Sequence, residues 1–296
     1  MLEKIDLIII SYNRQEELEE TIENVLLYRN SINKIIVIDN ASVDNTKEML
    51  EKYKQDVLFE IILSDENLGV AGGRNLGIQK SNADILVFLD DDAVFNVKEN
   101  PFEIVRKDFL NNSKLGIIAF KIVNFYSNEI QRHEFPFVDK NINANKTQKC
   151  AYYVGAGHAI KKEVFIKCGL YPEDYFYGKE ELDLSLRAIN KGYELLYEAQ
   201  IEVLHKQSPK GRMKNDEKWL QVYLNRLVIS YKYYPFQYKI VSNFLWFLKI
   251  VKITKNITIP LLSIKKYLNK KKDLEQDIIK KQSIKYIKKY KGRLFY

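Results

Sequence analysis

The sequence has little cysteine, proline or glycine, and each shortage excludes a class of protein. Two cysteines, Cys150 and Cys168, are too few for a disulfide scaffold or a cysteine-rich zinc module. Six prolines and twelve glycines in 296 residues exclude collagen-like and low-complexity chains. Because 46% of the residues are hydrophobic, the chain can form a buried core, and disorder is excluded as its main state.

Long hydrophobic runs are also missing. The apolar run near the N-terminus covers only residues 7–10, which is too short for the core of a signal peptide and predicts a buried strand. The longest apolar-rich stretch, residues 240–264, is interrupted by Lys249, Lys252 and Lys255. A bilayer span needs about 20 residues with few or no charges, so we do not expect this stretch to cross a membrane.

The net charge of +8 is unevenly distributed along the chain. Residues 236–296 hold sixteen Lys/Arg and three Asp/Glu, which gives a net charge of +13. Residues 1–235 hold 31 Lys/Arg and 36 Asp/Glu, which gives a net charge of −5. The basic character therefore belongs to a C-terminal tail on an acidic body. An acidic body disfavours binding to a phosphate backbone, so no nucleic-acid partner is expected, and the tail favours an anionic surface.

The first half of the chain alternates short apolar runs with helical patterns, typical of an α/β protein with a parallel sheet covered on both faces. Strands are expected at residues 5–10, 34–39, 57–63 and 85–89, and helices at 15–28, 44–54 and 70–80. Beyond residue 115 the expected elements are a strand (115–123), an irregular stretch (124–149), two helices (161–168 and 180–191) and two strands (193–197 and 201–205). In parallel sheets ligands bind beyond the carboxyl ends of the strands.

Three adjacent carboxylates, Asp90, Asp91 and Asp92, follow the fourth expected strand. Their mutual repulsion costs stability, and a divalent cation would relieve it. Oxygen ligands suit Mg²⁺ or Mn²⁺, which commonly bridge to substrate phosphates. An acidic surface turn is the alternative interpretation.

Other strand ends carry weaker signals. Asp39 can accept a hydrogen bond from a base or a ribose hydroxyl, or it can cap the next helix. Gly69, Gly72 and Gly73 would allow a phosphate to approach the backbone, but neither G-x-x-x-x-G-K-[ST] nor G-x-G-x-x-G occurs. His205 closes a strand, and a lone histidine there is either structural or a ligand.

Six segments of the chain, taken in sequence order, resemble the family 2 glycosyltransferases, which have the GT-A fold. The matching segments are IIISYNR (8–14), IVIDNASVDNT (36–46), NLGVAGGRNLGI (67–78), LVFLDDDA (86–93), residues 155–197 and VLHK (203–206). The resemblance implies a mostly parallel central sheet flanked by helices. It also implies a catalytic domain over residues 1–210, with a nucleotide-sugar half (1–123) and an acceptor half (124–210), before a basic amphipathic helical extension (211–296).

The implied activity is an inverting sugar transfer of the bacterial cell-surface glycan type, similar to rhamnosyltransferases. A UDP- or dTDP-sugar would donate to a hydroxyl of a glycan or lipid-linked glycan, with Mn²⁺ or Mg²⁺ as cofactor. A metal would neutralise the departing nucleoside diphosphate, and a carboxylate base would deprotonate the attacking hydroxyl. A single displacement then inverts the configuration of the sugar.

The resemblance also assigns site residues. Donor contacts fall on Ser11, Tyr12, Arg14, Asp39, Arg74, Asp90 and Asp91, and metal ligation on Asp92, Asp90 and His205. The family's E-D-x-D motif reads Glu180-Glu181-Leu182-Asp183 here, so the usual base falls on Glu181, with Glu180 as a second candidate. Asp183, Gly157 and His158 are expected on the acceptor side.

The tail has two interpretations. On a helical wheel of residues 240–264, one sector holds Lys249, Lys252, Lys255 and Asn256, and Trp246, Phe247, Ile250, Val251, Ile253 and Ile257 lie opposite. This pattern is typical of a membrane-surface helix, which would put the protein in the cytoplasm on the inner face of the plasma membrane. A helix packed on the catalytic domain or on another subunit is the alternative, which leaves a homo-oligomer open.

Two rival functions remain at this stage. A sugar-1-phosphate nucleotidyltransferase shares a similar sheet and metal site, but its glycine-rich loop after the first strand is absent from residues 11–14. The other rival is a non-catalytic, basic-tailed binding or scaffold protein, which the acidic cluster disfavours.

Overall fold

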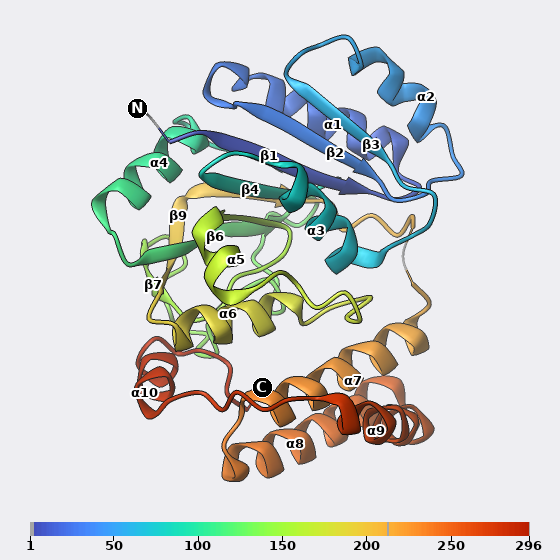
Figure 1. The fold of residues 1–296 in the computed structure, drawn as a ribbon, viewed down its shortest axis with the longest axis vertical. Helices are drawn as coiled ribbons and strands as arrows, with labels where there is room; N and C mark the ends of the chain where they lie inside the picture. The colour runs from blue at the N-terminus through green and yellow to red at the C-terminus, as the bar shows by residue number, and fades with distance from the viewer. Residues whose placement is uncertain (1–2, 212, 296) are drawn as a thin grey trace.

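A nine-stranded mixed sheet forms the centre of the part of the chain that the computed structural model describes, residues 3–211 and 213–295 (Figure 1). The strand order is β3-β2-β1-β4-β8-β6-β9-β5, and β7 pairs with β9. The strands are β1 (Ile5–Ser11), β2 (Lys34–Asp39), β3 (Phe59–Leu63), β4 (Ile85–Asp90), β5 (Ala93–Phe95), β6 (Leu115–Asn124), β7 (Gln148–Cys150), β8 (Gly157–Lys161) and β9 (Glu194–His205).

The first four strands pair in parallel, as their continuous apolar runs predict. In β1, Ile5, Leu7 and Ile9 enter the core on one face of the sheet, while Ile8 and Ile10 pack in the core on the other. Both faces of the sheet are covered by packed side chains. This explains why polar and apolar residues do not alternate along these strands. The carboxyl ends of β1, β2 and β4 therefore meet at one edge of the sheet.

The second half of the sheet is mixed. Strand β8 is antiparallel to both β4 and β6, whereas β6 and β9 are parallel. The two strands expected at 193–197 and 201–205 are one strand, β9, whose pairing with β6 shifts register between Phe120 and Lys121. That irregularity accounts for the interruption seen in the sequence pattern.

Helices cover both faces of the sheet (Figure 1). Side chains of α1 (Gln15–Leu26), α2 (Thr46–Leu50) and α4 (Pro101–Asn111) pack in one core, and those of α3 (Gly69–Lys80), α5 (Lys162–Cys168) and α6 (Glu180–Asn190) in the other. The helix expected over 44–54 is shorter than predicted, because α2 passes into a 3₁₀ turn over Glu51–Tyr53.

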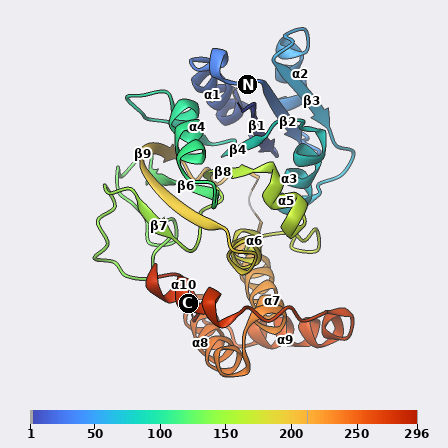
Figure 2. The same cartoon turned by 60° about the vertical axis from the view of Figure 1, so that its left-hand side comes forward.

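The C-terminal helices form a layer beneath α6, which Figures 1 and 2 both show. They are α7 (Asn215–Tyr233), α8 (Phe236–Thr254), α9 (Thr258–Lys270) and α10 (Lys281–Lys289). The apolar-rich stretch of residues 240–264 is divided between two helices, since α8 ends at Thr254 and the next residue, Lys255, has a left-handed φ of 53°. No helix in residues 3–211 and 213–295 is long and apolar enough to cross a membrane.

The apolar face expected on the tail also differs from the structure. Trp246 and Ile250 are buried in a core with Val222, Tyr223 and Leu227 of α7, so they do not face outward. Exposed large apolar side chains of α8 include Phe236, Ile240, Phe244 and Leu248, which follow one another at four-residue spacing along another side of the helix, and also Val241 and Ile253. The tail thus packs on the body through one face and presents a different apolar face to the outside.

Glycines in α3 bring that helix unusually close to the sheet. A methyl group at Gly77 would lie 2.7 Å from Cγ2 of Ile8 and 3.1 Å from Cδ1 of Ile38, and one at Gly73 would lie 2.9 Å from Cγ2 of Ile10. Both glycines therefore serve helix–sheet packing, whereas for Gly73 the sequence had offered phosphate binding as a weak signal. Among the glycines of α3, Gly69 alone has a positive φ, of 69°, and so needs the conformational freedom of glycine.

Replacing Gly77 with alanine tests this packing. Alanine forms helices better than glycine by about 1 kcal/mol, which alone would stabilise α3. We nevertheless expect Gly77→Ala to lower the free energy of unfolding by about 1–3 kcal/mol in urea titrations, because the methyl group overlaps Ile8. Gln79→Ala, at an exposed position of the same helix, is the control and should change little. A Gly77→Ala protein as stable as the wild type would contradict the packing argument.

Candidate active site

A cleft of about 580 Å³ opens where β1, β2 and β4 end. Expected site residues that line it are Ser11, Tyr12, Arg14, Arg74, Asp90, Asp91 and His205. Sequence reasoning missed several others, which are Asn40, Asn67, Val70, Phe176, Tyr177 and Met213. The missed residues come mostly from loops that approach only in the folded chain.

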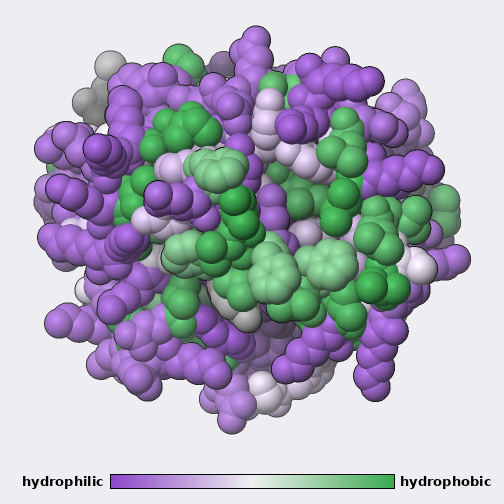
Figure 3. All heavy atoms as spheres, turned by 90° about the horizontal axis from the view of Figure 1, so that it is seen from below, coloured by the Kyte–Doolittle hydropathy of each residue, from purple (hydrophilic) through white to green (hydrophobic). Residues whose placement is uncertain are grey.

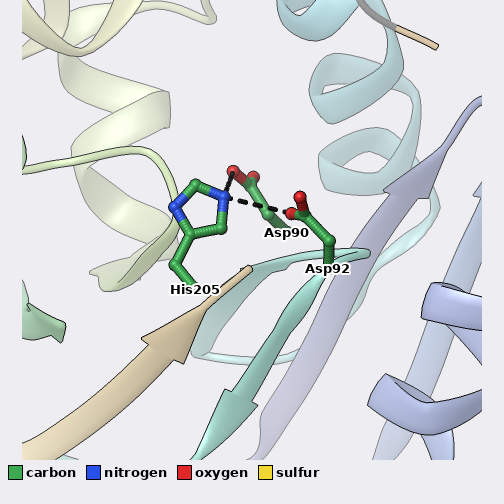
Figure 4. Close-up of side chains that lie close together, drawn as sticks. All are labelled: Asp90, Asp92 and His205. Carbon is green, nitrogen blue, oxygen red and sulfur yellow. Dashed lines mark ion pairs between the residues drawn. The ribbon is translucent and has the colours of Figure 1, made fainter. Parts of the chain in front are cut away.

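Asp90, Asp92 and His205 converge at one point beside this cleft, which Asp90 and His205 line (Figure 4). One oxygen of each carboxylate and one imidazole nitrogen all lie within 4.8 Å of one another. His205 Nε2 is 3.1 Å from Asp92 Oδ1 and 3.8 Å from Asp90 Oδ2. The pairing of Ala93 with His205 in the antiparallel β5–β9 ladder brings these distant residues together.

The donor set fits a divalent cation. Asp92 Oδ1 is buried and has no hydrogen-bond partner within the described residues. Two carboxylates and one imidazole are ligands that suit Mn²⁺ or Mg²⁺. Asp92 is fixed through its other oxygen, which accepts a 2.7 Å hydrogen bond from the Ser208 backbone N–H. The residues present can therefore hold such an ion.

Glu134 supports His205 from behind, and no sequence pattern pointed to it. Its carboxylate is buried and contacts His205 Nδ1 at 2.5 Å, from a loop with no regular pattern. This contact leaves Nε2 to face the two aspartates, the usual arrangement of a metal-binding histidine. Burial opposes protonation of His205, but Asp92 and Glu134 outweigh it and raise its pKa to about 10.

Asp91 differs from its two neighbours. Arg14 Nη1 lies 2.6 Å from Asp91 Oδ1 and 3.5 Å from Asp92 Oδ2, so the arginine spans two acids. Burial raises the pKa of Asp91 to about 7, against the opposing charge of Arg14. Burial acts in the same direction on Asp92, but the contact with His205 lowers its pKa to about 2.

Asp39 is the last residue of β2, and one of its two carboxylate oxygens accepts a hydrogen bond. Oδ1 accepts a 3.1 Å hydrogen bond from the Ser42 N–H, which is the capping role expected as an alternative. Oδ2 is buried and lacks a hydrogen-bond partner in the described part of the chain. Asp39 itself does not line the cleft, although its neighbour Asn40 does.

Arg74 joins Asp90, in the candidate metal site, to a second group of acids. Its guanidinium lies 3.4 Å from Asp90, 3.1 Å from Glu180 and 3.7 Å from Glu181, and it donates to the Gly155 carbonyl. The space beside it is narrow, since a methyl group at Gly155 would lie 2.4 Å from Glu181 Oε1.

The two adjacent glutamates have different environments. The side chain of Glu180 is 2% exposed, and that of Glu181 is 13% exposed. Burial and the charge of Glu181 raise the pKa of Glu180 to about 8, against the opposing charge of Arg74. Glu181 is therefore the more exposed of the two, although neither lines the cleft.

The three residues expected on the acceptor side do not line the cleft. Asp183 is fully buried and pairs with Arg187 at 2.6 Å. His158 is buried and stacks on Phe88, with ring centroids 4.7 Å apart, and burial lowers its pKa well below the usual value. Gly157 packs against Phe120. These contacts give all three a role in packing.

Similarity to known proteins bears on what the site does. The family model described as "Glycosyl transferase family 2" matches residues 6–169. An uncharacterized protein of Haemophilus influenzae is 33% identical over 171 residues, which cover 57% of this chain and 92% of that protein. The poly-beta-1,6-N-acetyl-D-glucosamine synthase of Staphylococcus aureus is 28% identical over 228 residues, 74% of this chain. The chain spans 54% of that synthase.

The fold is also similar to that of a solved structure. Comparison of this chain with the crystal structure of GalNAc-T7 with UDP, GalNAc and Mn²⁺ gives a TM-score of 0.64 and a sequence identity of 17%. The match covers 81% of this chain and 50% of that one. This similarity confirms the GT-A fold, and the family match decides against the nucleotidyltransferase and scaffold alternatives. The chain belongs to glycosyl transferase family 2 and is a glycosyltransferase.

Proposed function

We propose that this glycosyltransferase moves a sugar from a UDP- or dTDP-sugar to a hydroxyl of a cell-surface glycan or lipid-linked glycan, with inversion at the anomeric carbon. The observation that carries the proposal is the position of Arg74. Its guanidinium contacts Asp90 in the metal-binding group and Glu180 and Glu181 in the acidic pair. Donor activation and acceptor deprotonation could therefore take place side by side.

The donor would lie in the cleft along the ends of β1, β2 and β4. The unpartnered Asp39 Oδ2 suits an N–H of the base, and Ser11, Tyr12 and Asn40 come from the same edge. Arg14 and Arg74 are the cations nearest the expected diphosphate. In this scheme residues 1–123 form the donor half, residues 124–210 the acceptor half, and residues 211–296 the extension.

Asp90, Asp92 and His205 would hold Mn²⁺ or Mg²⁺, with Glu134 orienting the histidine. When bound, the cation supplies positive charge to the leaving nucleoside diphosphate. GalNAc-T7 is similar in fold and was solved with UDP and Mn²⁺, which supports this choice.

Glu181 is the proposed base. Its carboxylate is partly exposed beside Arg74, whereas Glu180 is buried and its pKa is raised to about 8. A group mostly protonated at neutral pH makes a poor base, so Glu180 instead fixes Arg74. Glu181 would accept the acceptor's proton as the hydroxyl oxygen bonds the anomeric carbon and the bond to the diphosphate oxygen breaks.

Paired variants test the assignment of the base. We expect Glu181→Gln to lower the rate of sugar transfer about 10²–10⁴-fold, the usual contribution of a general base. Its dissociation constant for UDP with Mn²⁺ should stay within about twofold of wild type, because Glu181 touches no donor group in this scheme. Glu180→Gln is the matched control, and we expect it to lower the rate of sugar transfer less than Glu181→Gln does. If Glu180→Gln loses more activity than Glu181→Gln, the roles are reversed.

Glu134 offers a test of the metal site. We expect Glu134→Gln to weaken Mn²⁺ binding about 10- to 100-fold, as loss of a supporting carboxylate behind a histidine ligand usually does. Isothermal titration calorimetry with Mn²⁺ and UDP measures this effect. Glu129→Gln changes an exposed acid of the same loop and should bind like the wild type. Equal Mn²⁺ affinity in both variants would argue against a metal ligand at His205.

We also propose that the protein contacts an anionic membrane through its C-terminal helices. Phe236, Ile240, Phe244 and Leu248 are spaced by one helical turn on α8 and are 72%, 54%, 61% and 48% exposed. We call these four residues the apolar stripe. Figure 3, a view from below, shows apolar side chains across the middle of this face with hydrophilic ones around them.

The lysines around this face complement an anionic surface. Exposed lysines of the tail include Lys252, Lys255, Lys265, Lys266, Lys271 and Lys272. An apolar strip bordered by lysines is the pattern of a helix lying in the membrane interface. Docking there would bring the enzyme to a lipid-linked acceptor.

Vesicle binding tests the apolar stripe. The C-terminal helices bury residues such as Tyr234 and Trp246, so point variants are cleaner than truncation. We expect Phe244→Ser with Leu248→Ser to weaken co-sedimentation with phosphatidylglycerol vesicles about 10-fold or more, since each buried side chain contributes about 1.5–3 kcal/mol. Leu110→Ser changes an 82% exposed leucine on α4 and should bind normally. Equal sedimentation of all three proteins would rule out this surface.

A further inference from the structure

Residues 177–179, which we call the entry turn, lead into α6 with an unusual backbone. Gly178 and Lys179 follow one another with φ values of 76° and 81°, and α6 begins at the next residue, Glu180. Glycine adopts this left-handed conformation freely, but a lysine seldom does, because its Cβ comes too close to the following carbonyl oxygen. The conformation of Lys179 therefore needs support from the surrounding structure.

The position of Glu181 follows from the entry turn. The N–H of Asp183 donates to the Lys179 carbonyl at 3.0 Å, so Glu181 lies within the first turn of the helix. A different backbone conformation at Lys179 would start α6 in another direction. The carboxylate of Glu181 would then move relative to Arg74, which now lies 3.7 Å from it.

Lys179 cannot stabilise this helix start with its own side chain. Helices commonly begin at Ser, Thr, Asp or Asn, whose side-chain oxygen accepts a hydrogen bond from an N–H of the first turn. Lys179 occupies that position before α6, and a lysine side chain has donors but no acceptor. The support for the entry turn must therefore come from elsewhere in the fold.

Asn225 of α7 supplies it. Its side chain is fully buried, and Nδ2 donates to the Gly178 carbonyl at 2.8 Å and to the Tyr177 carbonyl at 3.2 Å. These carbonyls belong to the two planar peptide groups on either side of Gly178. The second of these groups also sets φ of Lys179. One side-chain amide thus fixes both peptide groups that carry the left-handed backbone.

Helices α7 and α8 also pack on the entry turn. A methyl group at Gly178 would lie 3.3 Å from Cγ2 of Val222, and Lys179 Nζ lies 4.5 Å from the centre of the Trp246 ring. Val222 and Trp246 belong to one core, against which Tyr177 packs. The packing of the C-terminal helices therefore keeps the amide of α7 at the turn.

The loop before the entry turn is attached to α3. The side chain of Asn75 donates to the Tyr171 carbonyl and accepts from the Tyr171 N–H, and the Val70 N–H donates to the Phe176 carbonyl at 3.3 Å. Since α3 also carries Arg74, these contacts fix the loop relative to that arginine. The segment that leads into α6 is thus attached to α3 at one end and to α7 at the other.

We propose that Asn225 is a positioning residue for sugar transfer, which fixes the entry turn and thereby places the carboxylate of Glu181 beside Arg74. The inference rests on the proposed role of Glu181 as the base. Asn225 is not among the described residues that line the cleft, so it acts through α6 and not on the donor. It gives the C-terminal helices a part in the reaction that is separate from the proposed membrane contact.

Asn225→Leu removes both hydrogen bonds at nearly unchanged volume. We expect it to lower kcat for sugar transfer about 10- to 100-fold, since small displacements of a reacting group are costly. KM for the nucleotide sugar should stay within about twofold of wild type, because the donor cleft is not altered. Ser230→Ala is the matched control, since Ser230 is equally buried on α7 but donates within the helix, to the Leu227 carbonyl. An unchanged kcat in Asn225→Leu, or an equal loss in Ser230→Ala, would overturn the proposal.

Hydrogen exchange followed by mass spectrometry examines the entry turn without any substrate. We expect faster exchange in residues 176–186 of Asn225→Leu, with wild-type exchange in β1 and β4. Unchanged exchange in residues 176–186 would reject the proposal. Faster exchange there, together with a wild type that turns over no nucleotide sugar, would refute the proposed function and still support the coupling of Asn225 to α6.

Lys179→Gly provides a rescue experiment. Glycine adopts a φ of 81° without the cost that a lysine bears. We therefore expect the loss of kcat caused by Asn225→Leu to be about fivefold smaller in a Lys179→Gly background. An equal loss in both backgrounds would contradict a role through the backbone of Lys179. If Asn225→Leu does not fold, Asn225→Ser, which leaves room for water at the two carbonyls, takes its place in all three experiments.

Discussion

The active site depends on one buried guanidinium. Arg74 is 3% exposed, and its charge is tolerated there because Asp90, Glu180 and Glu181 surround it. Burial alone would lower the pKa of Arg74, but these acids and Tyr171 reverse the effect and raise it. Removing the arginine would leave several carboxylates close together in a poorly solvated place. The arginine therefore holds these three acids together around one positive charge.

The position of Arg74 depends in turn on glycine packing. Gly73 and Gly77 let α3 approach β1 so closely that the arginine reaches from the helix to the end of β4. Gly73, with Gly69 and Gly72, also stood out in the sequence as a weak signal for a phosphate loop. A pattern of glycines cannot distinguish close approach to a ligand from close approach to a strand, since both need the same missing side chain.

Local patterns predicted the part of the site that follows regular strands. Apolar runs located β1, β2 and β4, and parallel pairing then required Ser11, Asp39 and Asp90 to meet at one edge. Glu134, Asp183 and His158 could not be interpreted in this way, because their roles depend on distant partners. Glu134 lies in an irregular loop and contacts a strand 71 residues away. His158 has the chemistry of a ligand but is enclosed by Phe88 and Tyr153.

The basic tail combines two kinds of positive charge that composition cannot separate. Lysines at the surface, such as Lys252 and Lys265, stay solvated and cost little. Arg226 is fully buried and Lys249 half-buried, and both lower the pKa of Lys179. Helical periodicity revealed that the tail has an apolar and a basic side but not which side meets the body. Trp246 faces inward with Lys249 beside it, so the packing of this one aromatic ring places Lys249 on the side of α8 that faces the fold rather than on its outer face.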